Sequence, residues 1–163
     1  MKFNLTILAA GLLAASPLFA ESHEAEATEP MENAEAAEEL VITGNAEAGE
    51  KLFRQCAACH VVVNAEGETL AGKASKTGPN LYGVAGAVAG SVEGFKYSNL
   101  MSEANEAGIV WTEEAFVPYI QDPTGYLTGA TGESGRSNMT PQRMRKPEDA
   151  ADLFAYLHSL ASE

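Results

Sequence analysis

The sequence predicts an all-α fold built from short helices. After the first 45 residues, small and apolar residues recur at helical spacing, at Gly49, Phe53 and Cys56. A second apolar stripe at helical spacing lies near the end, at Leu153, Tyr156, Leu157 and Leu160. Runs of β-branched residues, which would predict strands, are scarce. These three observations favour helices at both ends of one domain.

The first 43 residues lie outside this predicted domain. Residues 1–20 carry Lys2, then a nearly continuous apolar run, then Pro17, a pattern typical of a cleaved export signal peptide. Residues 21–43 form an acidic segment rich in alanine and glutamate, which predicts a disordered tether. We therefore assign 44–163 to the folded domain and expect export to the bacterial periplasm. An uncleaved N-terminus that anchors the protein is the alternative.

The expected elements follow in order along this domain. The ranges are a first helix at 46–58, a long loop with room for a small hairpin at 61–76, short helices at 99–106, 113–121 and 123–126, and a last helix at 147–160. Pro147 suits the first turn of the last helix, where Glu148 and Asp149 favour the positive end of its dipole. Beyond residue 40, 15 acidic residues face 9 basic ones, so nucleic-acid binding is not expected.

The stretch CAACH, Cys56 to His60, contains both cysteines of the chain. A structural zinc would need four ligands, and the chain has no second cluster of cysteine and histidine. A thioredoxin-like disulfide would need strands around it. Covalent haem attachment needs only this motif, with thioether bonds from Cys56 and Cys59 and iron ligation by His60. Export agrees with this chemistry, and the motif therefore predicts one haem c.

With a haem granted, the chain resembles class I cytochrome c, and closely the bacterial cytochrome c2 branch. The stretches that carry the resemblance span about residues 44–160 and are AEAGEKLFRQCAACH, KTGPNLYGVAG, FKYS, YIQDPTGYL, SNMTP and DLFAYL. The resemblance implies a class I cytochrome c fold, with short helices wrapped around one covalently bound haem. It also implies that the first and last helices cross, with Gly49 allowing their close approach.

The resemblance further implies a methionine as the second axial ligand of the iron. Met139 lies in a loop rich in Gly, Ser and Thr, 14 residues before Leu153, as the ligand methionine does in this family. Met144 is only nine residues before Leu153 and is interpreted as a neighbour. Met101 is expected in the core, and His158 on the surface of the last helix. Histidine and methionine ligation would leave no open position on the iron.

Four other residues match positions that surround the haem in the family. Pro79 matches the proline whose carbonyl accepts the ring N–H of the ligand histidine. Tyr97 and Trp111 match residues that hydrogen-bond a haem propionate, and Tyr119 matches a tyrosine near the methionine sulfur. Core packing is the alternative for each aromatic residue.

The chain also departs from the family at three positions. An arginine that often lies near a propionate is absent, and Ala87 stands in its place. Pro141 replaces a common phenylalanine, and Asn138 replaces a common lysine. Without this cation a buried propionate would be costlier to ionise, so the reduction potential and its pH dependence are not inferred from the family.

The expected function is electron transfer without catalysis. The resemblance implies a periplasmic carrier that takes electrons from the cytochrome bc complex and passes them to a terminal oxidase or a photosynthetic reaction centre. A basic docking face is expected around the haem, from Lys73, Lys76, Lys96, Arg136, Arg143, Arg145 and Lys146. A membrane-tethered carrier and the electron-entry module of a haem enzyme such as a peroxidase are the alternatives. A monomer is the default expectation.

Overall fold

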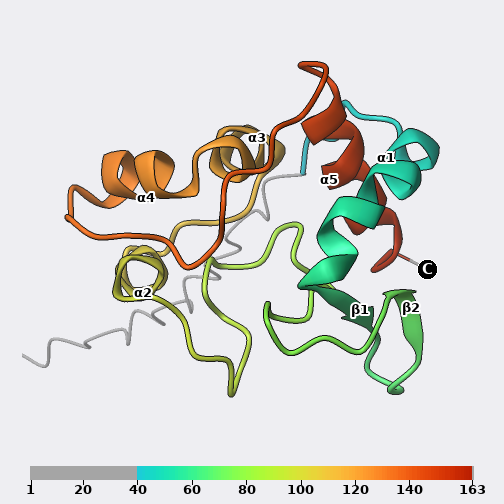
Figure 1. Ribbon diagram of the computed structural model, residues 1–163, viewed down its shortest axis with the longest axis horizontal. Coiled ribbons are helices and arrows are strands. Elements are labelled where there is room, and N and C mark those ends of the chain that lie inside the picture. Colours follow the sequence, from blue (N-terminus) through green and yellow to red (C-terminus); the bar gives the residue numbers. More distant parts are fainter. Residues whose placement is uncertain (1–39, 163) are drawn as a thin grey trace, which may run out of the picture. The chain divides into compact units, whose positions relative to one another are not determined.

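The computed structural model describes residues 40–162, and its elements confirm the all-α prediction with one small sheet added (Figure 1). In chain order they are α1 (Ala46–Leu52), a 3₁₀ helix (Phe53–Ala58), β1 (Val61–Val63), β2 (Thr69–Gly72), α2 (Asn99–Glu106), α3 (Glu113–Gln121), α4 (Pro123–Thr131) and α5 (Asp149–Ser159). The predicted signal peptide and residues 21–39 of the predicted tether lie outside the described residues.

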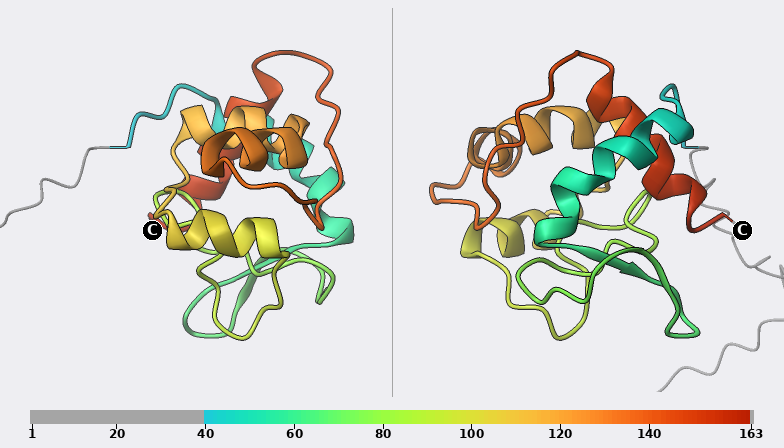
Figure 2. Two further views of the ribbon diagram at one scale, coloured as in Figure 1. Left: turned by 90° about the vertical axis from the view of Figure 1, so that its left-hand side faces the viewer. Right: turned by 45° about the vertical axis from the view of Figure 1, so that its right-hand side comes forward.

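Helices α1 and α5 cross and pack against each other (Figure 2). The Asn45 side chain caps α1 by accepting the Ala48 N–H at 2.9 Å. A Cβ at Gly49 would overlap the backbone carbonyl of Asp152, so only glycine allows this close approach. Beyond it, the rings of Phe53 and Tyr156 pack with their centroids 5.7 Å apart. The predicted crossing of the two end helices is confirmed.

Helix boundaries agree with prediction where a capping residue marks them. Ser98 and Thr112 cap α2 and α3, which begin and end at the predicted residues. The expected helix at 123–126 continues instead to Thr131, and Gly132 ends it in the left-handed conformation. The second half of the predicted helix at 46–58 is a 3₁₀ helix, which is wound more tightly than an α-helix and includes the first three residues of CAACH.

The small sheet lies in the segment expected as a long loop. Strands β1 and β2 pair antiparallel, with an irregularity between Val62 and Val63. The Asn80 side chain accepts the Val63 N–H at 2.9 Å and donates to the Val63 carbonyl at 2.8 Å. Asn80 therefore ties the segment that follows the sheet to β1.

Residues 40–43 pack on the domain, although the sequence prediction placed them at the end of the tether. Leu40 and Ile42 lie against the core, and the Glu113 carboxylate accepts hydrogen bonds from the N–H and hydroxyl of Thr43. The folded domain therefore begins by residue 40. Within 40–162, no helix has the length and apolar character needed to cross a bilayer.

Candidate functional site

One cavity of about 390 Å³ opens between the 3₁₀ helix, α5, the segment after β2 and the chain before α5. Its volume is within the range of about 300–1,000 Å³ typical of sites for small molecules and cofactors. The eight residues predicted from the sequence all line it: Cys56, Cys59, His60, Pro79, Tyr97, Trp111, Tyr119 and Met139. No Asp, Glu, Lys or Arg among the described residues lines it, so its wall is neutral.

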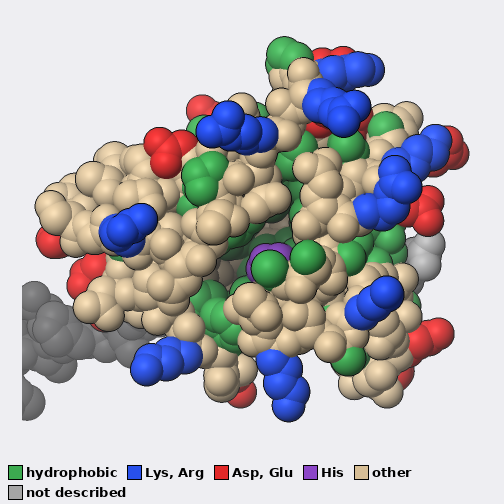
Figure 3. Space-filling model, in the orientation of Figure 1, with side chains coloured by type: hydrophobic (Ala, Val, Ile, Leu, Met, Phe, Trp, Pro, Cys, Tyr) green, Lys and Arg blue, Asp and Glu red, His purple; other side chains and the backbone are tan. Residues whose placement is uncertain are grey.

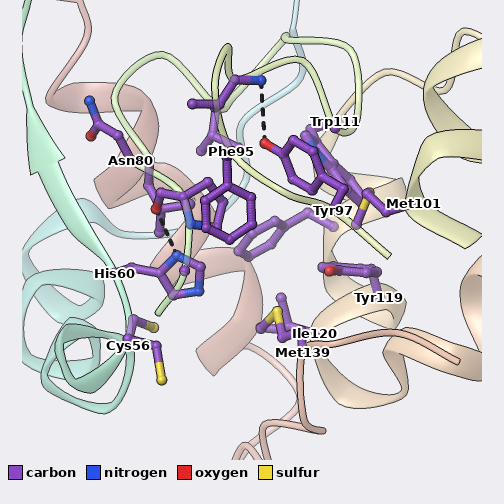
Figure 4. Close-up of a pocket in the computed structure, with 18 of the residues that line it drawn as sticks. Cys56, His60, Asn80, Phe95, Tyr97, Met101, Trp111, Tyr119, Ile120 and Met139 are labelled. Atoms are coloured by element: carbon purple, nitrogen blue, oxygen red, sulfur yellow. Dashed lines mark hydrogen bonds between the residues drawn. The ribbon is translucent and has the colours of Figure 1, made fainter. Parts of the chain in front are cut away.

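His60 is held in one orientation at the cavity wall (Figure 4). Its Nδ1 lies 2.9 Å from the Pro79 carbonyl oxygen, which can only accept a hydrogen bond. Nδ1 therefore carries the proton, and Nε2 is left with a lone pair for a metal. Burial lowers the pKa of His60, although the hydrogen bond to Pro79 opposes this shift. A neutral imidazole with a free Nε2 suits an iron ligand.

Gly78 makes this arrangement possible, and sequence analysis did not identify it. A Cβ at this position would overlap the His60 ring. The Gly78 N–H also donates to the Cys59 carbonyl at 2.7 Å, which joins the glycine to the CAACH segment. The glycine is visible in KTGPNL, but its role depends on a ring 18 positions earlier in the chain.

Neither cysteine forms a disulfide, and both line the cavity together with His60. Burial, with a further contribution from nearby Cys59, raises the pKa of Cys56 to about 11. The backbone N–H of His60 donates to the Cys56 carbonyl at 2.9 Å. This turn after the 3₁₀ helix places the histidine on the same side of the cavity as the cysteines. Within residues 40–162, no group of three or more His, Cys, Asp or Glu residues could hold a metal ion. The described residues therefore offer no zinc cluster.

Aromatic side chains form the wall of the cavity away from CAACH (Figure 4). Trp111 and Tyr119 are buried with their ring centroids 4.5 Å apart. Burial raises the pKa of Tyr119 to about 12, against the opposing effect of a hydrogen bond with Ser137. The Tyr97 hydroxyl accepts the Val92 N–H at 3.3 Å, which leaves its own proton free to be donated. Trp111 and Tyr119 therefore pack against each other, and the hydroxyl groups of Tyr97 and Tyr119 also form hydrogen bonds.

Met139 lies across the cavity from His60, on the loop before α5 (Figure 4). Its side chain is half-buried against the core, and its N–H donates to the Ser137 hydroxyl at 3.1 Å. Met101 is buried in α2 and also lines the cavity. Met144 and His158 do not line it. Among the described residues, Met139 and Met101 are therefore the two thioethers that line the cavity, and Met139 is the one on a loop.

The donor set fits a covalently attached haem. Two cysteines that form no disulfide and an imidazole with an available Nε2 lie together on one side, and a thioether lies on the other. The lining between them is mainly apolar and aromatic, with further contributions from Leu153 and Leu157 of α5, which sequence analysis had identified only as part of an apolar stripe. Ala87 also lines the cavity, so the missing family arginine leaves this wall without a cation.

Basic side chains surround the opening of the cavity, with acidic ones nearer the edges of this face (Figure 3). A cleft beside the cavity is lined by four of them, Lys51, Arg54, Arg143 and Arg145, and by one acidic residue, Asp149. Gln55 lines both the cleft and the cavity, so the two adjoin. We call these four residues the basic cleft. Sequence analysis included Arg143 and Arg145 but missed Lys51 and Arg54, which belong to the first helical segment.

A model of the cytochrome c family matches residues 46–161 of the chain. A cytochrome c2 of Rhodovulum adriaticum is 55% identical over 119 residues, which cover 73% of this chain and 94% of that protein. A cytochrome c2 of Cereibacter sphaeroides is 46% identical over 123 residues, which cover 75% of this chain and 85% of that protein.

Solved structures give the same similarity in three dimensions. Cytochrome c2 from Rhodobacter sphaeroides matches with a TM-score of 0.69 and 45% identity, covering 74% of this chain and 99% of that one. Cytochrome c-550 from Paracoccus versutus matches with a TM-score of 0.65 and 38% identity, covering 73% and 99% of the two chains. The family match includes all eight predicted site residues.

Proposed function

The chain belongs to the cytochrome c family, and from this premise we propose that its haem iron is ligated by His60 and Met139 and shuttles electrons between periplasmic partners. It is an electron carrier with one covalently bound haem c, as its cytochrome c2 relatives are. The observation that carries the ligation proposal is the free Nε2 of His60 with Met139 across the same cavity.

The haem supplies an iron that changes its charge by one when an electron arrives or leaves. Residues of the chain favour the reduced state of the iron over the oxidised state. A soft thioether at Met139 and a cavity lined without charged side chains both disfavour the extra positive charge of the oxidised state. Two protein ligands on the iron also exclude a substrate from it, which agrees with a carrier rather than a peroxidase.

The basic cleft is the proposed docking surface. Its four cations are exposed, and none forms an ion pair with another described residue. The cleft adjoins the cavity through Gln55, so a partner seated there would approach the haem edge. Positive charge at this place would attract acidic partner surfaces despite the acidic composition of the whole chain.

The proposed donor is the cytochrome bc complex, and the proposed acceptor is a terminal oxidase or a photosynthetic reaction centre. The names of the cytochrome c2 relatives and the basic cleft support this proposal. A periplasmic location follows from the export signal expected in residues 1–20.

The ligation is tested by replacing one methionine at a time in the haem-loaded protein. Met139→Ala should abolish the weak red absorption band of methionine-ligated ferric haem and lower the reduction potential, because a hard ligand such as water would replace the thioether. Met144→Ala is the matched control and should keep both. Retention of the band in Met139→Ala would overturn the ligation.

The partners are tested by mixing the pre-reduced protein with membranes of its source organism and following its oxidation optically. Oxidation in the dark that requires oxygen identifies an oxidase as acceptor. Oxidation only under illumination identifies a reaction centre. If neither occurs, the proposed acceptors are wrong, although the haem and its ligands are unaffected by that result.

A further inference from the structure

The loop that carries Met139 has few attachments before the methionine. Gly132 ends α4, and residues 132–136 are all exposed. Ser137 is the first half-buried residue after them, and its hydrogen bonds include one between its side chain and Tyr119 of α3 and two made with the loop and with α4. Its N–H donates to the Thr124 hydroxyl at 3.1 Å, and its own hydroxyl accepts the Met139 N–H at 3.1 Å. The position of Met139 therefore depends on what holds Ser137.

We propose that Thr124 is a positioning residue for Met139, which it holds through Ser137. This inference rests on the proposed ligation of the iron by Met139. The Thr124 hydroxyl lies in the first turn of α4, 13 positions before the serine to which it is bonded. It is the contact that holds the backbone N–H of Ser137, whose side chain is also hydrogen-bonded to Tyr119 of α3.

Helix α4 is a firm support for this contact. The Asp122 side chain caps it by accepting the Gly125 N–H at 3.0 Å, and Leu127 is fully buried on its inner face. On the other side of Met139, the Gln142 N–H donates to the Ile120 carbonyl of α3 at 2.6 Å. Met139 is thus bracketed by one anchor two residues before it and another three residues after it.

Removal of the Thr124 hydroxyl should loosen the first anchor and leave the second. The partly buried Ser137 N–H would lose its acceptor, which costs free energy unless the loop opens to water. We expect the open population of the loop to rise about tenfold, equivalent to ~1.4 kcal/mol.

The experiment compares three variants of the haem-loaded full chain. Thr124→Val removes the hydroxyl with little change in shape, and Thr124→Ser keeps a hydroxyl and should rescue the contact. Thr128→Val makes the same chemical change at an exposed position of the same helix. Two readouts are recorded: hydrogen exchange of the Ser137 and Met139 amides, and the affinity of the ferric protein for added imidazole.

In Thr124→Val we expect both amides to exchange about tenfold faster and imidazole to bind about tenfold more tightly, because it competes with Met139. Thr124→Ser and Thr128→Val should behave like the wild type. Wild-type values in Thr124→Val would overturn the positioning role.

A separate measurement distinguishes this failure from failure of the proposed ligation. The NMR signal of the Met139 methyl group in the reduced wild type should show the large ring-current shift of an iron ligand. If it does not, the ligation is wrong and the positioning role falls with it. If it does, the variants decide the role of Thr124 alone.

Discussion

The two sides of the cavity differ in how the chain holds them. On the His60 side, the histidine, Gly78 and Pro79 are linked by short contacts, and Asn80 ties the same segment to β1. On the Met139 side, the loop is held by a few hydrogen bonds, those of Ser137 with Thr124 and Tyr119 and that of the Gln142 N–H with the Ile120 carbonyl. We therefore expect His60 to stay in place as long as the domain is folded, and the segment that carries Met139 to move without unfolding of the domain.

The largest effect should follow from crowding the histidine side. In Gly78→Ala, the new Cβ would overlap the His60 ring, and we expect the free energy of unfolding to fall by about 3 kcal/mol. Denaturant unfolding of the haem-loaded protein measures it. Gly129→Ala is the control, because nothing lies within 4 Å of a Cβ there, and alanine favours a helix. Equal stability of the two variants would show that the histidine side is not tightly packed.

The next effect should come from Asn80→Ala. The substitution removes the two hydrogen bonds to Val63 and one from the Tyr82 N–H, so we expect a loss of about 2 kcal/mol of stability. The red band of methionine-ligated ferric haem should remain, since Asn80 does not hold the Met139 loop. Loss of the band at unchanged stability would reverse the comparison between the two sides.

A smaller effect is expected on the rate of electron transfer to a partner that docks at the basic cleft. Arg143→Glu reverses one charge of the basic cleft and should slow oxidation by membranes about tenfold at low salt. Arg136→Glu makes the same change outside the cleft and should slow it less. Stopped-flow rates over a series of salt concentrations measure both. Equal slowing by the two variants would mean that docking is not centred on the cleft.

The smallest effect is expected on the reduction potential, when a charge is added to the uncharged lining of the cavity. Ala87→Arg would place a cation at the cavity wall, and a cation favours the iron state of lower charge. We expect the reduction potential to rise by tens of millivolts in a redox titration, with Ala87→Gln as the uncharged control. A fall in potential, or the same change in both variants, would contradict an electrostatic effect.

Much of the fold was predictable because local signals marked its elements. Ser98 and Thr112 are capping residues directly before α2 and α3, and the structure begins both helices where the sequence predicted. The extension of α4 to Thr131 was missed because its Gly and Thr residues have low helix propensity. Residues 40–43 were missed because their anchor, Glu113, is 70 positions away from Thr43.

The candidate site divides in the same way. CAACH predicts three of its residues directly, and the family resemblance led to five more that line the same cavity. No local sequence pattern indicated the contact between Thr124 and Ser137. None indicated that Lys51 and Arg54 line one cleft with Arg143 and Arg145 either. Their roles arise only when the loop folds back on α4 and on the first helix, so they depend on tertiary contacts rather than on sequence pattern.

Titration of the oxidised, haem-loaded protein with imidazole tests the central claim most directly, with NMR signals of His60 and Met139 followed together. Because the His60 side is held more firmly than the Met139 side, we expect imidazole to displace Met139 first, while His60 remains on the iron and the fold stays intact. Displacement of His60 before Met139, or loss of both ligands in one unfolding step, would contradict it.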